Sequence, residues 1–156
     1  MKKTSLILIF CLFVFSQFAK SQSCTPIVAA DLRRMLVELG YEVKDLNLAV
    51  DKEKFEIKIL TPTFNVPMGV ELSGNKNNIW FTVALGKAFE ETSPKNFALL
   101  KRNAVIQPSQ FYITEKGNLM MAVALENKCV TNAALKKISD MLANKVSENK
   151  IYWQAN

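Results

Sequence analysis

The side chains that could carry out chemistry are few in this protein of 156 residues. It contains no histidine and three cysteines. Without histidine, it cannot use Ser-His or Cys-His catalytic pairs, and it cannot form a zinc site with an imidazole ligand. It also lacks a glycine-rich phosphate loop and the Gly-x-Ser-x-Gly pattern of serine hydrolases. We therefore expect no catalytic residue, no metal ion and no cofactor.

Carboxylates are the remaining candidates for acid-base chemistry. Glu90 and Glu91 are adjacent, so on a helix their side chains would point about 100° apart and could not flank one scissile bond. Asp51 and Glu53 lie in a short run of alternating charges that is typical of a solvated hairpin tip. A calcium loop would need further oxygen ligands at fixed spacing. Neither pair predicts an active site.

The first 21 residues predict export. Two lysines precede an almost wholly apolar run over residues 5–18, and residues 19–21 have the small-x-small pattern of a signal-peptide cleavage site. The apolar run is shorter than the ~20 residues that a membrane-spanning helix needs. We expect a bacterial signal peptide over 1–21, a single domain over 22–156, and a periplasmic or secreted protein without stable membrane insertion.

Removal of that segment changes the net charge. The whole sequence has 20 Lys and Arg residues against 14 Asp and Glu residues, a formal charge of +6. Cleavage after Ser21 removes three lysines and leaves 17 basic residues, so the charge falls to +3. A charge this small and this evenly spread does not favour nucleic acid as a partner.

Two cysteines remain after cleavage, Cys24 and Cys129. An even number of cysteines in an oxidising compartment favours a disulfide, and there is no Cys-x-x-Cys spacing to indicate redox or metal chemistry. Closing a loop of about a hundred residues would contribute roughly 4 kcal/mol in the chain-entropy model. Each cysteine precedes a predicted helix, so the pairing would make the starts of the first and last helices neighbours.

Three amphipathic helices are predicted from apolar residues at helical spacing and from capping signals. The first begins at Thr25 and ends at Gly40. The second begins at Ser93 and ends before Pro108, and the third begins after Thr131. Their apolar stripes are Val28, Leu32, Met35, Leu36 and Leu39, then Phe97, Leu100, Ala104 and Val105, then Leu135, Ile138, Met141, Leu142 and Val146.

Strands are predicted between the helices, where apolar and polar residues alternate and one face would be buried. Two prolines in 61–67 predict a loop or a ragged edge, although alternation continues over 66–72. We expect an α+β fold with an antiparallel sheet of about five strands and three helices, in the order α-βββ-α-ββ-α, with helices covering at least one sheet face. The predicted strands cover 46–50, 55–59, 79–85, 111–113 and 119–125.

A family resemblance is found in the second half of the sequence. Leu-Leu-x-x-Asn at 99–103 is followed by Phe-Tyr-Ile at 111–113, a turn at Gly117 and a hydrophobic strand. This succession resembles the type III secretion chaperone-like fold, shared by the CesT-type secretion chaperones and the YbjN family. The resemblance implies a non-enzymatic, often dimeric protein that binds peptides or has a regulatory role. Secretion chaperones of that type are cytoplasmic and usually acidic, so we do not expect a type III effector chaperone.

The alternation also predicts a binding surface. It places Trp80, Tyr112 and Met120 on the sheet face opposite the main apolar face. Such a face favours burial against the second helix, the termini, a second copy of the protein or a bound peptide. We predict that an exported, non-enzymatic protein uses these residues, or the groove beside the second helix, to bind a protein or peptide partner or itself.

Two other functions are weighed against this prediction. A small-ligand carrier or an envelope enzyme would need a pocket with convergent polar groups between helices and sheet, whereas the predicted interior is aliphatic or Phe. A cystatin-like protease inhibitor is disfavoured because the Gln-x-Val-x-Gly loop is absent.

Overall fold

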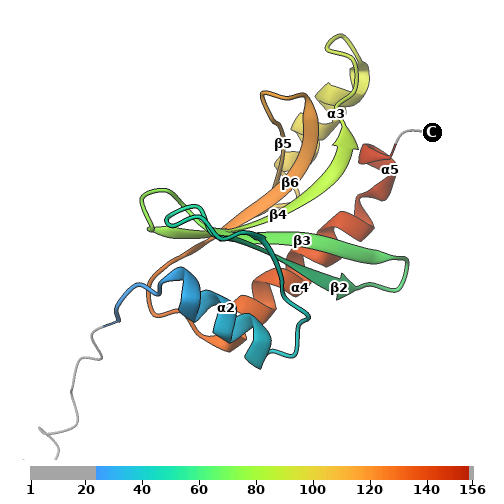
Figure 1. The fold of residues 1–156 in the computed structure, drawn as a ribbon. Helices are drawn as coiled ribbons and strands as arrows, with labels where there is room; N and C mark the ends of the chain where they lie inside the picture. Colours follow the sequence, from blue (N-terminus) through green and yellow to red (C-terminus); the bar gives the residue numbers. More distant parts are fainter. Residues whose placement is uncertain (1–23, 155–156) are drawn as a thin grey trace, which may run out of the picture.

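The computed structural model describes residues 24–154, and the predicted signal peptide over 1–21 lies outside this range. Within it, four helices and six strands follow one another (Figure 1). Their bounds are α2 (Ala29–Glu38), β1 (Lys44–Asn47), β2 (Lys54–Leu60), β3 (Asn65–Leu72), β4 (Asn78–Lys87), α3 (Pro94–Asn103), β5 (Gln110–Ile113), β6 (Asn118–Glu126), α4 (Asn132–Glu148) and α5 (Lys150–Trp153).

The strands form one antiparallel sheet in the order β1-β2-β3-β4-β6-β5. The predicted α+β class and the overall order of elements are confirmed. The sheet has one strand more than the five predicted, because β3 forms a regular strand of eight residues where a loop or ragged edge was expected.

Pro67 is compatible with this regular strand because of where the pairing between β3 and β4 stops. β4 pairs only with the part of β3 from Gly69 to Leu72, so the half of β3 that holds Pro67 has β2 as its sole neighbour. Locally, β3 is therefore an edge strand at Pro67, a place where a missing N–H leaves no ladder bond unmade.

One face of the sheet forms the core. On β2, β3, β4 and β6, every second residue is buried against α2 and α4, which lie side by side beneath the sheet (Figure 1). Burying each of these side chains stabilises the fold by roughly 1.5–3 kcal/mol. The fully buried large residues are Leu32, Leu36, Phe55, Ile57, Met68, Ile79, Phe81, Ile106, Leu119, Met121, Leu135 and Leu142.

The prediction of a buried face on the first strand is wrong. All four residues of β1 are exposed, and Leu48 and Val50 lie in the turn that follows it. The turn begins earlier than expected because the side chain of Asn47 accepts a hydrogen bond from the Ala49 N–H at 2.9 Å. β1 is thus a short edge strand whose apolar residues face solvent.

The start of α2 also differs from the prediction. The helix begins at Ala29 rather than at Thr25, and its N-terminus lacks a capping side chain. The preceding backbone is held extended by buried Asn127, which accepts from the Ile27 N–H and donates to the Ile27 C=O, both at 3.0 Å. A third hydrogen bond from Asn127, to the Lys76 C=O, ties this segment to the β3–β4 turn.

The caps of the other two long helices are confirmed. Ser93 precedes α3 and accepts a hydrogen bond from the Lys95 N–H, while Thr131 precedes α4 and accepts from the Ala134 N–H. Side-chain oxygens at these positions satisfy helix N–H groups that have no partner within the helix.

Cys24 and Cys129 lie in the segments that lead into α2 and α4. Their side chains are in disulfide geometry, with Cα atoms 4.7 Å apart across a sequence separation of 105. Asn127 lies two residues before Cys129, so a disulfide and a buried amide would hold the same segment. The segments that lead into the first and last long helices are thus neighbours, whereas the start of α4 itself lies beside the end of α2, where Asn132 donates to Glu38.

Candidate functional site

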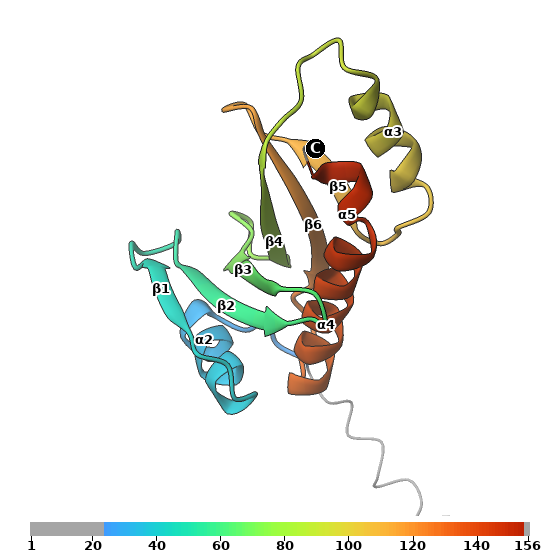
Figure 2. The same cartoon turned by 90° about the vertical axis from the view of Figure 1, so that its right-hand side faces the viewer.

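The helices leave one face of the sheet uncovered. α2, α3 and α4 each contribute residues to the buried cluster on the core face. Two perpendicular views show these helices on that side of the sheet (Figures 1 and 2). The opposite face, here called the open face, has no helix over it within the described residues. The second helix therefore does not cover the predicted binding residues.

The three predicted residues share this open face. Trp80 lies on β4, Tyr112 on β5 and Met120 on β6, and each is partly exposed. The register pairs Met120 with both Tyr112 and Ala84, and it places Trp80 opposite Ala124. The alternation of the strands thus placed these side chains correctly, whereas their role as binding residues stays a prediction.

The apolar character of the open face is limited to β4, β6 and β5. On β2 and β3 the same face holds charged side chains, including Lys54 and Glu71, whose Nζ and Oε1 atoms lie 2.9 Å apart. The stem of Lys54 crosses Gly69, where an added Cβ would lie 2.9 Å from Lys54 Cε. The open face is therefore charged over β2 and β3 and apolar over β4, β6 and β5.

A shallow hollow of about 360 Å³ lies where these halves meet. Burial, followed by the negative charge of Glu71, raises the pKa of the Tyr112 hydroxyl above its ordinary value. Tyr112 thus stays neutral at physiological pH and can donate a hydrogen bond. The hollow is lined by Glu71, Trp80, Thr82, Gln110 and Tyr112.

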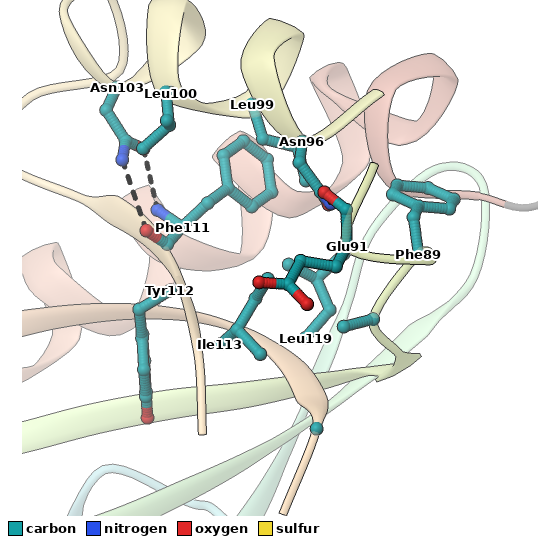
Figure 3. Close-up of a pocket in the computed structure, with 12 residues that line it drawn as sticks. Phe89, Glu91, Asn96, Leu99, Leu100, Asn103, Phe111, Tyr112, Ile113 and Leu119 are labelled. Atoms are coloured by element: carbon teal, nitrogen blue, oxygen red, sulfur yellow. Dashed lines mark hydrogen bonds between the residues drawn. The ribbon is translucent and has the colours of Figure 1, made fainter. Parts of the chain in front are cut away.

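A second hollow, here called the α3 groove, lies between α3, β5 and the segment that joins β4 to α3 (Figure 3). Its volume is about 390 Å³, and most of its lining is apolar. This is the groove beside the second helix that the sequence pointed to. It is lined by Ala88, Phe89, Glu91, Asn96, Leu99, Leu100, Asn103, Phe111, Tyr112, Ile113, Gly117 and Leu119.

Two asparagines build this groove. Asn103 donates to the Phe111 C=O at 3.1 Å and accepts from the Phe111 N–H at 2.7 Å (Figure 3). Its amide thereby occupies the outer edge of β5 as a neighbouring strand would. Asn96 donates to the backbone C=O groups of Glu90 and Glu91, which fixes the segment before α3.

The far side of α3 is held by an arginine. Arg102 donates from Nε to the buried side chain of Asn149, and its guanidinium lies 5.0 Å from the centre of the Tyr152 ring. These contacts attach α3 to α4 and α5. The sequence patterns did not predict the roles of Asn103 and Arg102, although Asn103 is the last residue of the Leu-Leu-x-x-Asn motif.

The predicted apolar stripe of α3 faces solvent rather than the core. Phe97, Leu100 and Val105 are 61%, 64% and 64% exposed, whereas Leu99 and Ile106 are buried. The prediction is wrong because α3 lies at the edge of the sheet and turns Leu99 toward it. Since Leu100 also lines the α3 groove, the exposed flank and the groove form one apolar surface.

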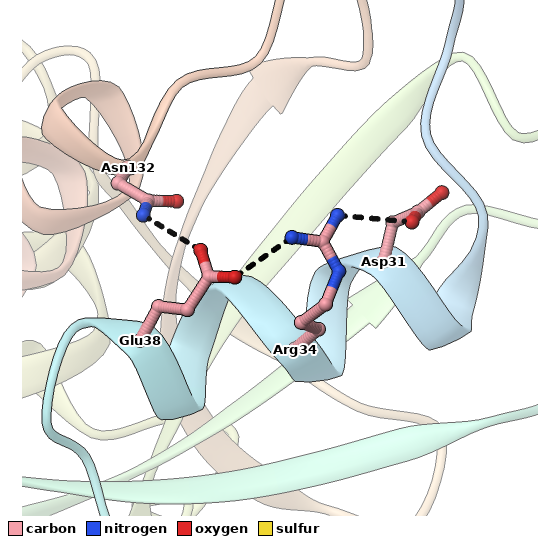
Figure 4. A network of polar contacts seen from close by, with 4 residues as sticks. All are labelled: Asp31, Arg34, Glu38 and Asn132. Atoms are coloured by element: carbon pink, nitrogen blue, oxygen red, sulfur yellow. Dashed lines mark hydrogen bonds and ion pairs between the residues drawn. The ribbon is translucent and has the colours of Figure 1, made fainter.

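A network of exposed polar side chains lies outside these surfaces. Arg34 pairs with Glu38 at 2.7 Å and Asp31 at 3.2 Å, and Asn132 donates to Glu38 at 3.1 Å (Figure 4). The hydrogen bond from Asn132, and then that from Arg34, lowers the pKa of the Glu38 carboxyl. This network is exposed and links α2 to the start of α4, which is a structural role.

Metal-ligand clusters and membrane-spanning helices are both absent from residues 24–154. In this range, no three His, Cys, Asp or Glu side chains come close enough together to hold a metal ion. No helix in the same range has the length and apolar character needed to cross a membrane. Glu91 lines the α3 groove as its one carboxylate, without a second carboxylate or a base beside it.

Comparison with known proteins supports the fold. No protein-family model and no characterised protein sequence matches this one. Among solved structures, the protein is similar to one in the heterodimeric ExoU–SpcU complex from the type III secretion system of Pseudomonas aeruginosa, with 18% identity, 78% of this protein and 96% of the other covered, and a TM-score of 0.53.

A second similar structure is that of the Yersinia pestis type III secretion chaperone SycH in complex with a stable fragment of YscM2. The identity is 12%, the match covers 77% of this protein and 97% of the other, and the TM-score is 0.50. At these identities the likeness concerns the fold alone. The resemblance found in the sequence is confirmed, and the protein has the type III secretion chaperone-like fold.

Proposed function

We propose that this protein is an exported, non-enzymatic binding protein that holds a segment of a partner protein in the α3 groove. The observation that carries the proposal is the continuity of the groove with the exposed flank of α3. Isolated exposed apolar residues are ordinary, but a contiguous apolar surface beside a hollow is typical of a binding site. A volume of about 390 Å³ lies within the usual range of ligand pockets.

Polypeptide is the ligand class that this surface fits best. The groove is lined by Leu, Ile and Phe side chains from four separate segments, and polar groups are a minority of its lining. Its acceptors are Glu91 and the Asn96 Oδ1 atom, which has no hydrogen-bond partner among the described residues. Both similar solved structures contain a protein of this fold together with another protein, which supports protein binding.

The partner segment would bind through its side chains rather than by adding a strand to β5. Strand addition requires free backbone N–H and C=O groups at the sheet edge. At Phe111 both groups are already bonded to Asn103. An apolar side chain inserted beside Leu99 and Leu100 avoids this obstacle.

Export rests on the predicted signal peptide and on the cysteine pair. Cys24 and Cys129 lie in disulfide geometry, and a disulfide persists in the periplasm or outside the cell but rarely in the cytosol. The disulfide geometry therefore supports export of this protein. Its neighbours in fold belong to secretion systems.

Site-specific photocrosslinking tests the proposal. A photoreactive residue replaces Leu100 in one variant and Leu60 in another, because Leu60 is 82% exposed but lies at the end of β2, away from the groove. In envelope and medium fractions we expect a discrete crosslinked partner at position 100 and none at position 60. The mass of the product separates a partner protein from a second copy of this one.

A charge substitution completes the test. Leu100→Glu should abolish partner crosslinking from a neighbouring groove position, Ile113, while Leu60→Glu leaves it intact. Both side chains are exposed, so both variants should keep the denaturation midpoint of the wild type. Equal crosslinking from positions 100 and 60, or a product that contains only this protein, would contradict the proposal.

A further inference from the structure

We propose that the hollow on the open face binds a proline-rich peptide segment in the polyproline II conformation. This inference concerns the open face rather than the α3 groove, although Tyr112 lines both hollows, and it names the chemistry of the ligand. It uses two of the residues that the sequence marked, Trp80 and Tyr112, together with Gln110. Three features of the hollow carry it: its shape, its unpaired polar groups and its rigidity.

The hollow has aromatic walls and a floor of small side chains. The register places Thr82, Ala122 and Gln110 in one row across β4, β6 and β5. Thr82 and Ala122 are 8% and 1% exposed, so they form the floor. Trp80 and Tyr112 lie two residues away from this row on opposite sides. An extended peptide can cross the row with pyrrolidine rings against the two aromatic rings, as in other aromatic-lined grooves that bind proline-rich segments.

Each of the polar side chains that have no partner in the hollow can donate a hydrogen bond. Within the described residues, no side-chain hydrogen bond involves the Trp80 indole N–H, the Tyr112 hydroxyl or the Gln110 amide. The other two polar side chains are engaged, since Glu71 pairs with Lys54 and the Thr82 hydroxyl donates to the Gly69 C=O at 3.4 Å. An indole N–H can only donate, and the neutral phenol can donate as well.

A proline-rich segment offers the matching acceptors. Proline has no N–H, and the polyproline II helix makes no internal hydrogen bonds, so its carbonyl groups are free to accept. A saccharide would present a donor at each hydroxyl as well as acceptors, whereas a proline-rich segment presents acceptors beside apolar rings, which matches the indole N–H and the aromatic rings of Trp80 and Tyr112. The combination of apolar rings and unpaired carbonyls therefore favours the proline-rich peptide.

The floor of the hollow is held in shape by the paired strands β4, β6 and β5 before any ligand binds. The Lys54–Glu71 pair spans two strands with both side chains about one third exposed, and Tyr112 is partly buried on β5. A rigid site and a stiff ligand both lose little conformational freedom on binding. This favours a short proline-rich segment over a flexible peptide of the same length.

Tryptophan fluorescence gives a direct test, because the protein contains two tryptophans, Trp80 and Trp153. In the Trp153→Phe variant, expressed from the full sequence, Trp80 is the sole emitter. The probe is an acetylated and amidated ten-residue peptide that repeats Pro-Pro-Leu, and the control peptide has alanine at each proline. We expect a saturable change in Trp80 emission with the proline peptide and at least tenfold weaker binding of the alanine peptide.

A pair of tyrosine variants places the binding site. Tyr112→Phe removes one hydroxyl from the hollow and should weaken binding about fivefold, the effect of one hydrogen bond. Tyr152→Phe makes the same change on α5, outside the hollow, and should leave the affinity unchanged. The substitution Leu100→Glu in the α3 groove should also leave it unchanged, so failure here and failure of the proposed function are distinguishable.

Several results would overturn the inference. No emission change up to millimolar peptide, equal binding of the alanine peptide, or full affinity in Tyr112→Phe would each do so. A larger response to a cello-oligosaccharide than to the proline peptide would show that the aromatic hollow recognises a saccharide instead.

Discussion

Asn103 is expected to protect the edge of β5 as well as to hold α3. Its side chain makes two hydrogen bonds to the backbone of Phe111, whose ring is buried in the core. Replacement by alanine removes both bonds and leaves an N–H and a C=O at a sheet edge. At about 1 kcal/mol for each bond, Asn103→Ala should lower the free energy of unfolding by about 2 kcal/mol.

Urea denaturation measures this loss. The midpoint should fall while the slope stays constant, because the surface exposed on unfolding does not change. The matched control is Gln107→Ala, which removes an exposed amide that donates to the Asn103 C=O at 2.9 Å, and it should cost less than about 0.5 kcal/mol. Asn103→Asp keeps the acceptor for the Phe111 N–H but places a carboxylate oxygen against the Phe111 C=O, so it should destabilise at least as much as alanine.

The exposed edge gives a second readout for the same variant. Unpaired edge groups promote pairing with another polypeptide, so Asn103→Ala should self-associate more than the wild type on size-exclusion chromatography. The amide of Phe111 should also exchange its hydrogen faster. A loss of stability below about 0.5 kcal/mol with unchanged exchange at Phe111 would refute this account of the edge.

Two further predictions concern the segment around the start of α4, which contacts the chain before α2 and the end of α2. In protein purified without reductant, Cys24 and Cys129 should not react with a thiol-alkylating reagent after denaturation. The variant in which serine replaces both cysteines should lose up to roughly 4 kcal/mol of the free energy of unfolding, the value for a loop of this length. The carboxyl of Glu38 has a lowered pKa in the folded state, so its contribution to stability is present above its ordinary pKa and is lost as the pH falls through the lowered value. Glu38→Gln should flatten the pH dependence of the denaturation midpoint in that acidic range, and an unchanged pH profile would contradict the role of this network.

Local sequence signals determined the elements of this fold. Ser93 and Thr131 start helices because a side-chain oxygen and the helix N–H groups it serves lie within three residues of each other. The shared face of Trp80, Tyr112 and Met120 follows from the twofold period of strands and from short turns. The same local order carried the resemblance to the chaperone-like fold.

Tertiary structure decided which surfaces are covered. The apolar residues of α3 point to more than one side, and only its position at the edge of the sheet decides that Leu99 is buried and Leu100 exposed. Pro67 fits into β3 because β4 separates from β3 after Thr82, and no pattern within β3 indicates where this pairing ends.

The asparagine contacts show the same division between local and long-range information. Asn127 bonds to Ile27 across 100 positions of the sequence, and an isolated asparagine in a sequence does not indicate its partner. By itself the sequence determined the number of long helices, most of the strands and the residues on each face of β4, β5 and β6, because these depend on neighbours within a few positions. The α3 groove, the uncovered open face and the buried amides depend on where distant elements meet, so only the tertiary structure decided them.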